Sequence, residues 1–197
     1  KPVTLATWFD NGYSAYSVVG GRNHYSARDW KVSGNCPVHA GSWDLKNATG
    51  GNNYATSVLE GTQKSLNTTY AGMASNLDLC DIYKMSQKLG AVTGDPTQKQ
   101  DLGPSFIIGA DSIPPLNMAN AFGTIASGGT LCSPVALEKV VDADGKTFKV
   151  SSGNCKRTVE ESVANKTAQV LVSTANSYGG RVNIGRQVMA KTGTTNG

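Results

Sequence analysis

Two cysteines that flank a predicted β-hairpin constrain this chain more than any other feature. Residues 135–150 hold two strand-like runs separated by the turn sequence Asp-Ala-Asp-Gly. If Val141 faces Lys146, the same antiparallel register places Cys132 opposite Cys155. Opposed residues have Cα atoms about 4.5 to 5.5 Å apart, a separation that a disulfide tolerates. We therefore expect a disulfide between Cys132 and Cys155 at the open end of the hairpin.

The four cysteines favour disulfides over a metal site. They are scattered, without any C-x-x-C spacing, and the chain has only two histidines to complete a zinc site. An even number of cysteines indicates an oxidising compartment, with four buried thiols as the alternative. Pro134 and Gly153 leave room for a shift in the hairpin register, and a pairing of Cys36 with Cys80 follows only by elimination.

The composition of the 197 residues is globular. Hydrophobic residues make up 39% and charged residues 16%, which excludes disordered and fibrous classes. No run approaches the roughly 18 apolar residues of a membrane span, and the length corresponds to one domain or a large part of one. The net charge of +4 is mild and the basic residues are scattered, so we expect no nucleic-acid partner.

Hydrophobic spacing predicts helices, the hairpin, a further helix and then a strand. The expected helices cover residues 1–11, 54–64, 68–79, 81–89 and 113–126, and residues 12–53 are expected to be irregular with short strands. In the helix before the hairpin, the predicted buried face contains Leu116, Ala119, Phe122, Ile125 and Ala126. A capping box at residues 158–161 predicts a helix that ends near residue 178, and residues 186–195 are predicted to form a strand.

Three short motifs gain meaning only as a set. Ser65-Leu66-Asn67 alone is typical of helix capping, and Lys191-Thr192-Gly193 alone is typical of a solvated strand end. Together with Lys1-Pro2 at the start of a helix, they follow the order of S-x-x-K, S-D-N and K-T-G. That set is far less frequent by chance than any of its members, and it belongs to serine acyltransferases.

The chain resembles the transpeptidase domain of a class A (bifunctional) penicillin-binding protein. The resemblance includes the three motifs, residues 113–122, Ala126-Ser127-Gly128-Gly129 and the hairpin turn, and the cysteines that flank the hairpin indicate an actinobacterial member. One departure is Leu66, where β-lactamases usually have Asp. The resemblance implies an α/β (α+β) fold of the penicillin-binding protein and serine β-lactamase type, with an antiparallel sheet flanked by helices. Residues 1–197 would form an internal part of one such domain, incomplete at both ends.

The resemblance also implies a role for each motif residue. Lys1 would accept a proton from a nucleophilic serine three residues upstream, outside this sequence, and Asn67 would orient Lys1 and hold the substrate amide. Ser65 would relay a proton to the leaving amine, and Lys191 would keep the local field positive. The substrate would then be bound by Thr192, Gly193 and Thr194, the two hydroxyls holding its carboxylate.

The function implied is that of a peptidoglycan D,D-transpeptidase that cross-links stem peptides and is inhibited covalently by β-lactams. It would need no cofactor and would work at the extracytoplasmic face of the bacterial membrane, with an N-terminal anchor and a glycosyltransferase domain upstream. A D,D-carboxypeptidase or β-lactamase of the same fold is the alternative enzyme. A non-catalytic β-lactam sensor or scaffold is the alternative from another class.

Overall fold

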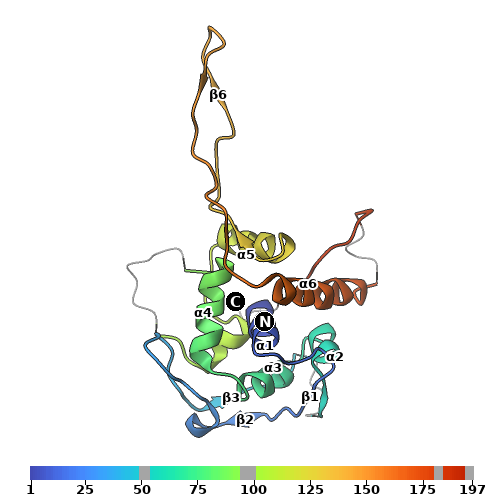
Figure 1. Cartoon of the computed structure of the whole chain (residues 1–197). Coiled ribbons are helices and arrows are strands. Elements are labelled where there is room, and N and C mark those ends of the chain that lie inside the picture. The colour runs from blue at the N-terminus through green and yellow to red at the C-terminus, as the bar shows by residue number, and fades with distance from the viewer. Residues whose placement is uncertain (49–53, 94–100, 180–183, 194–197) are drawn as a thin grey trace.

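The structure, a computed structural model, describes residues 1–48, 54–93, 101–179 and 184–193. Its helices are α1 (Pro2–Asp10), α2 (Val58–Gln63), α3 (Asn67–Ala74), α4 (Leu79–Leu89), α5 (Pro115–Ala126) and α6 (Glu161–Asn176), with 3-10 helices η1 (Ala27–Asp29) and η2 (Pro104–Ile108). Figure 1 shows α1 surrounded by α3, α4 and α6. None of the described helices is long and apolar enough to cross a membrane.

The strands are short and pair two by two. They are β1 (Val18–Val19), β2 (His24–Tyr25), β3 (Trp43–Asp44), β4 (Thr56–Ser57), β5 (Thr130–Leu131), β6 (Val140–Val141), β7 (Thr147–Phe148) and β8 (Lys156–Arg157). The antiparallel pairs are β1 with β4, β2 with β3, β5 with β8 and β6 with β7. The mixed α/β class and the antiparallel pairing are as expected. Within the described ranges, however, no sheet is larger than two strands.

Helix α1 forms the centre of the helical core. The predicted helix is confirmed, and Pro2 occupies its first turn, where a missing N–H leaves no hydrogen bond unmade. Residues 4–9 are all buried, so the helix is enclosed on every side rather than along one stripe. It packs chiefly against α4 and α6. This enclosure fixes the position of Lys1 at the N-terminal end of α1.

The start of α2 differs from the prediction. The helix expected from residue 54 begins only at Val58, after β4 has paired with β1. Ser57 is its N-cap and accepts a hydrogen bond from the N–H of Glu60 (3.2 Å). A capping serine of this kind has an extended backbone, so the helix cannot include it.

The boundary between α3 and α4 also differs from the prediction. The helix predicted over residues 68–79 ends at Ala74, and Leu79 instead begins α4. The N-cap Asp78 accepts a hydrogen bond from the N–H of Cys80 (2.9 Å), which fixes that start. Cys80 forms a disulfide with Cys36, so the pairing inferred by elimination is confirmed and ties the irregular segment to α4.

The buried face of α5 was predicted incorrectly. Its buried residues are Ala121, Thr124 and Ile125, whereas Leu116 is 61% exposed. Of the predicted face, Ile125 is buried and Phe122 is partly buried. Helix α5 packs against α4 and α6, and its buried residues all lie in its second half, whereas Pro115 and Leu116 at its start are exposed. Sequence periodicity gives the spacing of a face but not which neighbours it meets.

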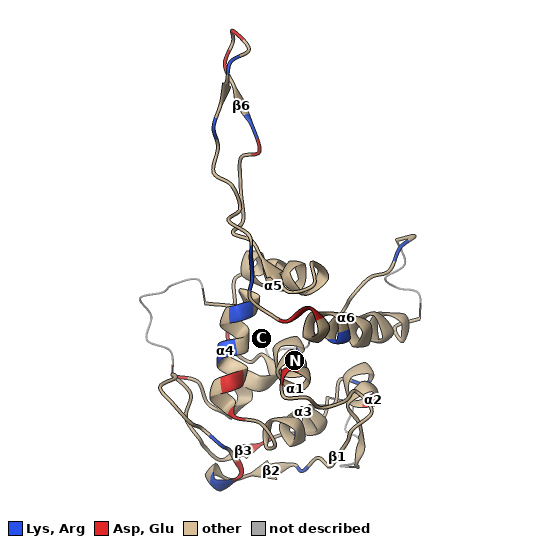
Figure 2. Cartoon of the chain, viewed as in Figure 1, with Lys and Arg blue, Asp and Glu red and all other residues tan. Residues whose placement is uncertain are grey.

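The base of the hairpin confirms the predicted disulfide. The pairing of β5 with β8 sets Leu131 opposite Lys156, and the next opposed residues, Cys132 and Cys155, form a disulfide. The side-chain amide of Asn120 on α5 donates a hydrogen bond to the carbonyl of Cys132 (3.0 Å). Figure 1 shows the hairpin projecting from this base beyond α5. Figure 2 shows residues of both charge signs along it.

The tip of the hairpin is shifted by one residue from the predicted register. Val141 pairs with Thr147 rather than with Lys146. The carboxylate of Asp142 accepts hydrogen bonds from the backbone N–H groups of Asp144 (3.1 Å) and Lys146 (2.8 Å), which draws Lys146 into the turn. The predicted strands are also shorter than expected, since only β6 and β7 form a ladder there.

The C-terminal part differs from the prediction in two respects. Thr158 forms no capping box, because its hydroxyl donates to the carbonyl of Lys88 (2.5 Å) and Glu160 is the N-cap of α6. The predicted strand over residues 186–195 has no ladder in its described part. Instead, the N–H of Ala190 donates to the carbonyl of Leu171 on α6 (3.3 Å), so this segment lies along the helix.

Candidate active site

The side chain of Lys1 reaches the turn between α2 and α3. Its Nζ donates hydrogen bonds to Oδ1 of Asn67 (2.6 Å), to Oγ of Ser65 (3.2 Å) and to the Ser65 carbonyl (3.1 Å). It also lies 5.7 Å from the ring centroid of the buried Tyr70, a cation–π contact. Ser65 and Asn67 lie 64 and 66 positions after Lys1 in the sequence, yet both contact its side-chain amine.

Ser65 occupies a backbone position that usually belongs to glycine. The N–H groups of Ser65 and Leu66 donate to the carbonyls of Thr62 (3.1 Å) and Gly61 (2.8 Å), which closes the C-terminus of α2. This pattern requires a left-handed residue, and Ser65 adopts φ +57°. Leu66 is 4% exposed and points into the core, which is a physical reason for an apolar residue in the middle of the motif. The turn leaves the Ser65 hydroxyl within hydrogen-bond distance of Lys1.

Lys191 reaches the same hydroxyl from the C-terminal segment. Its Nζ donates to Oγ of Ser65 (2.7 Å) and to the backbone carbonyl of Thr192 (3.1 Å). The Ser65 oxygen thus accepts from two lysine amines. Both of its lone pairs are engaged by these bonds, so its own hydrogen remains available to a third group.

Burial weakens the positive charge of both amines, and at Lys1 the charge of Lys191 adds to this effect. Burial, followed by the charge of Lys191, lowers the pKa of the Lys1 side chain to about 8. Burial also lowers the pKa of Lys191, against opposing contributions from Tyr178. A lysine with a depressed pKa is neutral often enough to accept a proton near neutral pH. The arrangement can therefore support general-base chemistry at Lys1 and proton transfer through Ser65.

The structure brings together Lys1, Ser65, Asn67 and Lys191, the four residues that the motifs predict as catalytic. Thr192 and Gly193 follow directly and are exposed. Thr194 lies outside the described residues. The assembly depends on three separate elements: the start of α1, the turn between α2 and α3, and the segment that lies along α6.

Three further residues support this site, and the motifs do not include them. Asn47 is buried, and its side-chain carbonyl accepts the backbone N–H of Thr68 (3.1 Å), next to Asn67. Tyr70 underlies Lys1, and the hydroxyl of Tyr178 accepts the backbone N–H of Thr192 (3.1 Å). Nothing in the local sequence distinguishes Asn47 or Tyr178, because their roles depend on contacts between distant segments.

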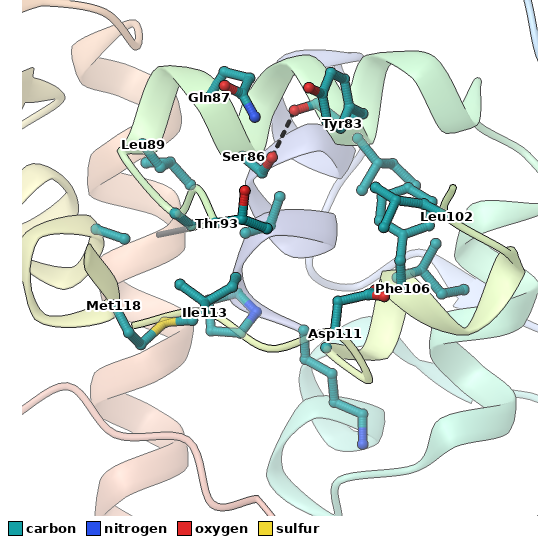
Figure 3. Close-up of a pocket in the computed structure, with 18 of the residues that line it drawn as sticks. Tyr83, Ser86, Gln87, Leu89, Thr93, Leu102, Phe106, Asp111, Ile113 and Met118 are labelled. Carbon is teal, nitrogen blue, oxygen red and sulfur yellow. Dashed lines mark hydrogen bonds between the residues drawn. The ribbon is translucent and has the colours of Figure 1, made fainter. Parts of the chain in front are cut away.

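An apolar pocket lies beside Lys1, between α4, η2 and α5. Figure 3 shows Leu102 and Phe106 on one side of it and Ile113 and Met118 on the other. Asp111 also lines the pocket, and burial raises the pKa of its carboxyl. No local sequence pattern marks this pocket, because its walls come from four elements: α1, α4, η2 and α5. It provides a largely apolar surface next to the polar cluster.

A model of the penicillin-binding protein transpeptidase domain family matches residues 1–197. The chain is 28% identical over 144 residues to penicillin-binding protein 1B of Escherichia coli (strain K12), a match that covers 71% of this chain and 16% of the relative. It is 26% identical over 172 residues to penicillin-binding protein 1A of Mycolicibacterium smegmatis, covering 80% and 22%. The matches thus span less than a quarter of either relative.

Solved structures share the fold. PonA1 of Mycobacterium tuberculosis in complex with penicillin V aligns with a TM-score of 0.79 at 20% identity, over 99% of this chain and 51% of that one. The imipenem acyl-enzyme complex of penicillin-binding protein A from the same species gives 0.76 at 20% identity, over 100% and 47%. With the family model matching from end to end, the chain belongs to the transpeptidase domain family of penicillin-binding proteins.

Proposed function

We propose that this chain is part of one D,D-transpeptidase domain, a serine acyltransferase that cross-links peptidoglycan stem peptides. The observation that carries the proposal is the Ser65 hydroxyl held between two lysine amines, one of which also bonds to Asn67. A cluster with this composition suits the movement of protons during acyl transfer. The membership of the family supports the same activity.

The proposed nucleophile is a serine three residues before Lys1 in the whole protein. Neutral Lys1 takes the proton of that hydroxyl, while the serine oxygen attacks the carbonyl carbon of the penultimate D-alanine. The lowered pKa of Lys1 supports this step, because it provides a neutral amine near neutral pH. The bond to the terminal D-alanine then breaks, and an ester with the enzyme remains.

Ser65 completes the proton path in this mechanism. It donates its hydrogen to the nitrogen of the leaving D-alanine and regains one from the Lys1 ammonium, which lies 3.2 Å away. An acceptor amine then attacks the ester carbonyl and forms the cross-link. Lys1 takes the proton that the amine loses and returns it to the serine oxygen as the ester bond breaks. Opening of a β-lactam ring follows the same first steps but leaves a tethered product.

The C-terminal segment is the proposed binding site for the substrate carboxylate. Lys191 supplies positive charge, and the hydroxyls of Thr192 and Thr194 donate hydrogen bonds. Gly193 leaves room for a peptide to lie along the backbone, and the N–H of Thr194 is one proposed donor to the oxyanion. The exposure of Thr192 and Gly193 is compatible with ligand access.

Relatives guide the remaining proposals about the whole protein. Penicillin V in the PonA1 structure and imipenem in penicillin-binding protein A support β-lactams as covalent inhibitors. The similarity of this chain to penicillin-binding proteins 1A and 1B supports an upstream glycosyltransferase domain and an N-terminal membrane anchor in the whole protein. The domain would then work at the extracytoplasmic face of the membrane.

The test is the intact mass of the full-length protein before and after exposure to penicillin. We expect a stable mass increase of one penicillin, mapped by peptide analysis to a serine three residues before Lys1. Lys1→Met should abolish the increase, whereas Lys84→Met, at an exposed lysine of α4, should not. No adduct on the unmodified protein would contradict the proposal.

A second assay separates the transpeptidase from related activities. The full-length protein is incubated with a stem pentapeptide and an acceptor amine, and the products are separated by mass. A cross-linked product is expected. Release of D-alanine alone would indicate a carboxypeptidase, rapid loss of the penicillin adduct a β-lactamase, and a persistent adduct without peptide turnover a sensor.

A further inference from the structure

Tyr178 contacts the Lys191-Thr192-Gly193 segment from the end of α6. The residue follows the helix C-cap Ser177, and its N–H still donates to the carbonyl of Ala175 (3.1 Å). The side chain then reaches across 14 positions of sequence to Thr192. Its hydroxyl oxygen accepts the backbone N–H of Thr192 (3.1 Å) and lies 3.3 Å from Oγ1 of the same residue.

The hydrogen-bond contacts around Thr192 favour one orientation for its hydroxyl. The Lys191 ammonium can only donate hydrogen bonds, and its Nζ donates to Oγ1 of Thr192 over 3.4 Å. The oxygen of Tyr178 accepts the Thr192 N–H and also has a hydrogen bond with the Lys191 side chain, so its own hydrogen is the one best placed to donate to Oγ1. Both lone pairs of the threonine oxygen are then occupied, and its hydrogen points away from the two donors.

We infer that Tyr178 is a positioning residue that orients the Thr192 hydroxyl to donate a hydrogen bond to the carboxylate of a ligand. Thr192 is exposed and adjoins the cationic Lys191, so an anionic group is the natural acceptor for its hydrogen. This inference rests on the proposed function, because the carboxylate belongs to a stem peptide or a β-lactam. It assigns specificity for the carboxylate to a residue outside the three motifs.

A purely structural role for Tyr178 makes a different prediction. If the tyrosine only held the segment against α6, its loss would displace Lys191 and Thr192 together. Every ligand would then react more slowly, whether or not it carried a carboxylate. Loss of the Tyr178 hydroxyl also removes its support of the Lys191 charge, which affects both kinds of ligand to the same extent. A hydroxyl that orients Thr192 adds a loss only for ligands with a carboxylate.

The test compares acylation of the full-length protein by benzylpenicillin and by benzylpenicillin methyl ester, which lacks the carboxylate. We expect Tyr178→Phe to lower the second-order rate constant for benzylpenicillin about 3- to 10-fold, the range for one lost hydrogen bond. The constant for the ester should change less than about 2-fold. The matched control is Tyr16→Phe, because Tyr16 is 76% exposed and its hydroxyl has no hydrogen bond to any described residue.

A double variant sharpens the result. Thr192→Val removes the hydroxyl but keeps the backbone N–H, so adding Tyr178→Phe to it should cause no further loss with benzylpenicillin. Equal losses for acid and ester, no loss for either, or a full additional loss in the double variant would each overturn the inference. If the unmodified protein reacts with neither compound, the proposed function fails, and the inference fails with it.

Discussion

Oδ1 of Asn67 accepts a 2.6 Å hydrogen bond from the Nζ of Lys1. The contact joins the residue before α1 to the first residue of α3. An amide oxygen orients the amine without adding a negative charge, whereas a carboxylate in its place would favour the protonated form. Burial and Lys191 can therefore keep the pKa of Lys1 at about 8.

The rate of acylation should rise with pH and level off above about pH 8. Lys1 must be neutral to accept a proton, and its lowered pKa makes the neutral form dominant above that value instead of above the ordinary 10.5. The measurement is the rate constant for penicillin acylation of the full-length protein across this range. An inflection near the ordinary value would show that Lys1 is not the base or is not buried as described.

Removing the charge of Lys191 should move that inflection to higher pH. The positive charge of Lys191 is the second cause of the lowered pKa of Lys1, after burial. In Lys191→Gln the repulsion disappears while the burial of Lys1 remains. The pH profile of Lys84→Gln, at an exposed lysine of α4, is the control and should match that of the unmodified protein. An unchanged inflection in Lys191→Gln would contradict the coupling of the two amines.

Replacing Asn67 by aspartate should slow acylation at neutral pH and spare it at high pH. The new carboxylate would form an ion pair with Lys1 that stabilises its charged form by roughly 1.5 kcal/mol. The neutral fraction of Lys1, and with it the rate of acylation, would then fall about ten-fold. Asn67→Ala lacks this charge, so its rate should fall at every pH to a similar extent. The two pH profiles distinguish the cases, and a fall in Asn67→Asp that is independent of pH would count against a proton-accepting Lys1.

The motifs predicted the residues that the structure brings together around Ser65, because each has a local sequence context that recurs in order. They could not predict the supporting residues, since Asn47 contacts Thr68 and Tyr178 contacts Thr192 only through tertiary packing. The left-handed backbone of Ser65 is a similar case. The sequence marks a helix junction there, but serine is an unusual occupant of the position, and a glycine would have been the expected signal.

Elements with strong local signals were predicted well. Pro2 marked the start of α1, and α4 ends at Leu89, as the predicted range 81–89 required, with Gly90 (φ +81°) as its C-cap. The inward face of α5 was wrong because the neighbours α4 and α6 decide it. The strand over residues 186–195 was also wrong in its described part. A strand exists only with a partner, and the described part of that segment lies against α6.

The two disulfides should affect stability differently. Cys36–Cys80 closes 44 residues and anchors the irregular segment to the buried start of α4, whereas Cys132–Cys155 closes 23 residues of an exposed hairpin. Loop entropy alone gives about 4 and about 3 kcal/mol. We expect Cys36→Ala with Cys80→Ala to lower the free energy of unfolding by nearly the full amount. Cys132→Ala with Cys155→Ala should mainly loosen the hairpin.

Urea unfolding and limited proteolysis of the full-length protein distinguish these effects. The first double variant should shift the unfolding midpoint strongly. The second should leave it nearly unchanged while cleavage within residues 133–154 becomes faster. Equal shifts of the midpoint would mean that the hairpin unfolds together with the helical core.

The hydroxyl of Ser65 should be needed for activity, although its backbone conformation lowers the stability of the protein. Its φ of +57° is costly for any residue with a Cβ, so Ser65→Gly should be more stable than Ser65→Ala by about 1 kcal/mol. Both variants lose the oxygen that accepts from Lys1 and Lys191, and both should lose most of the acyl-transfer rate. Urea unfolding gives the first comparison and peptide turnover the second. If the glycine variant were the less stable of the two, the left-handed turn that ends α2 would not be the conformation in solution.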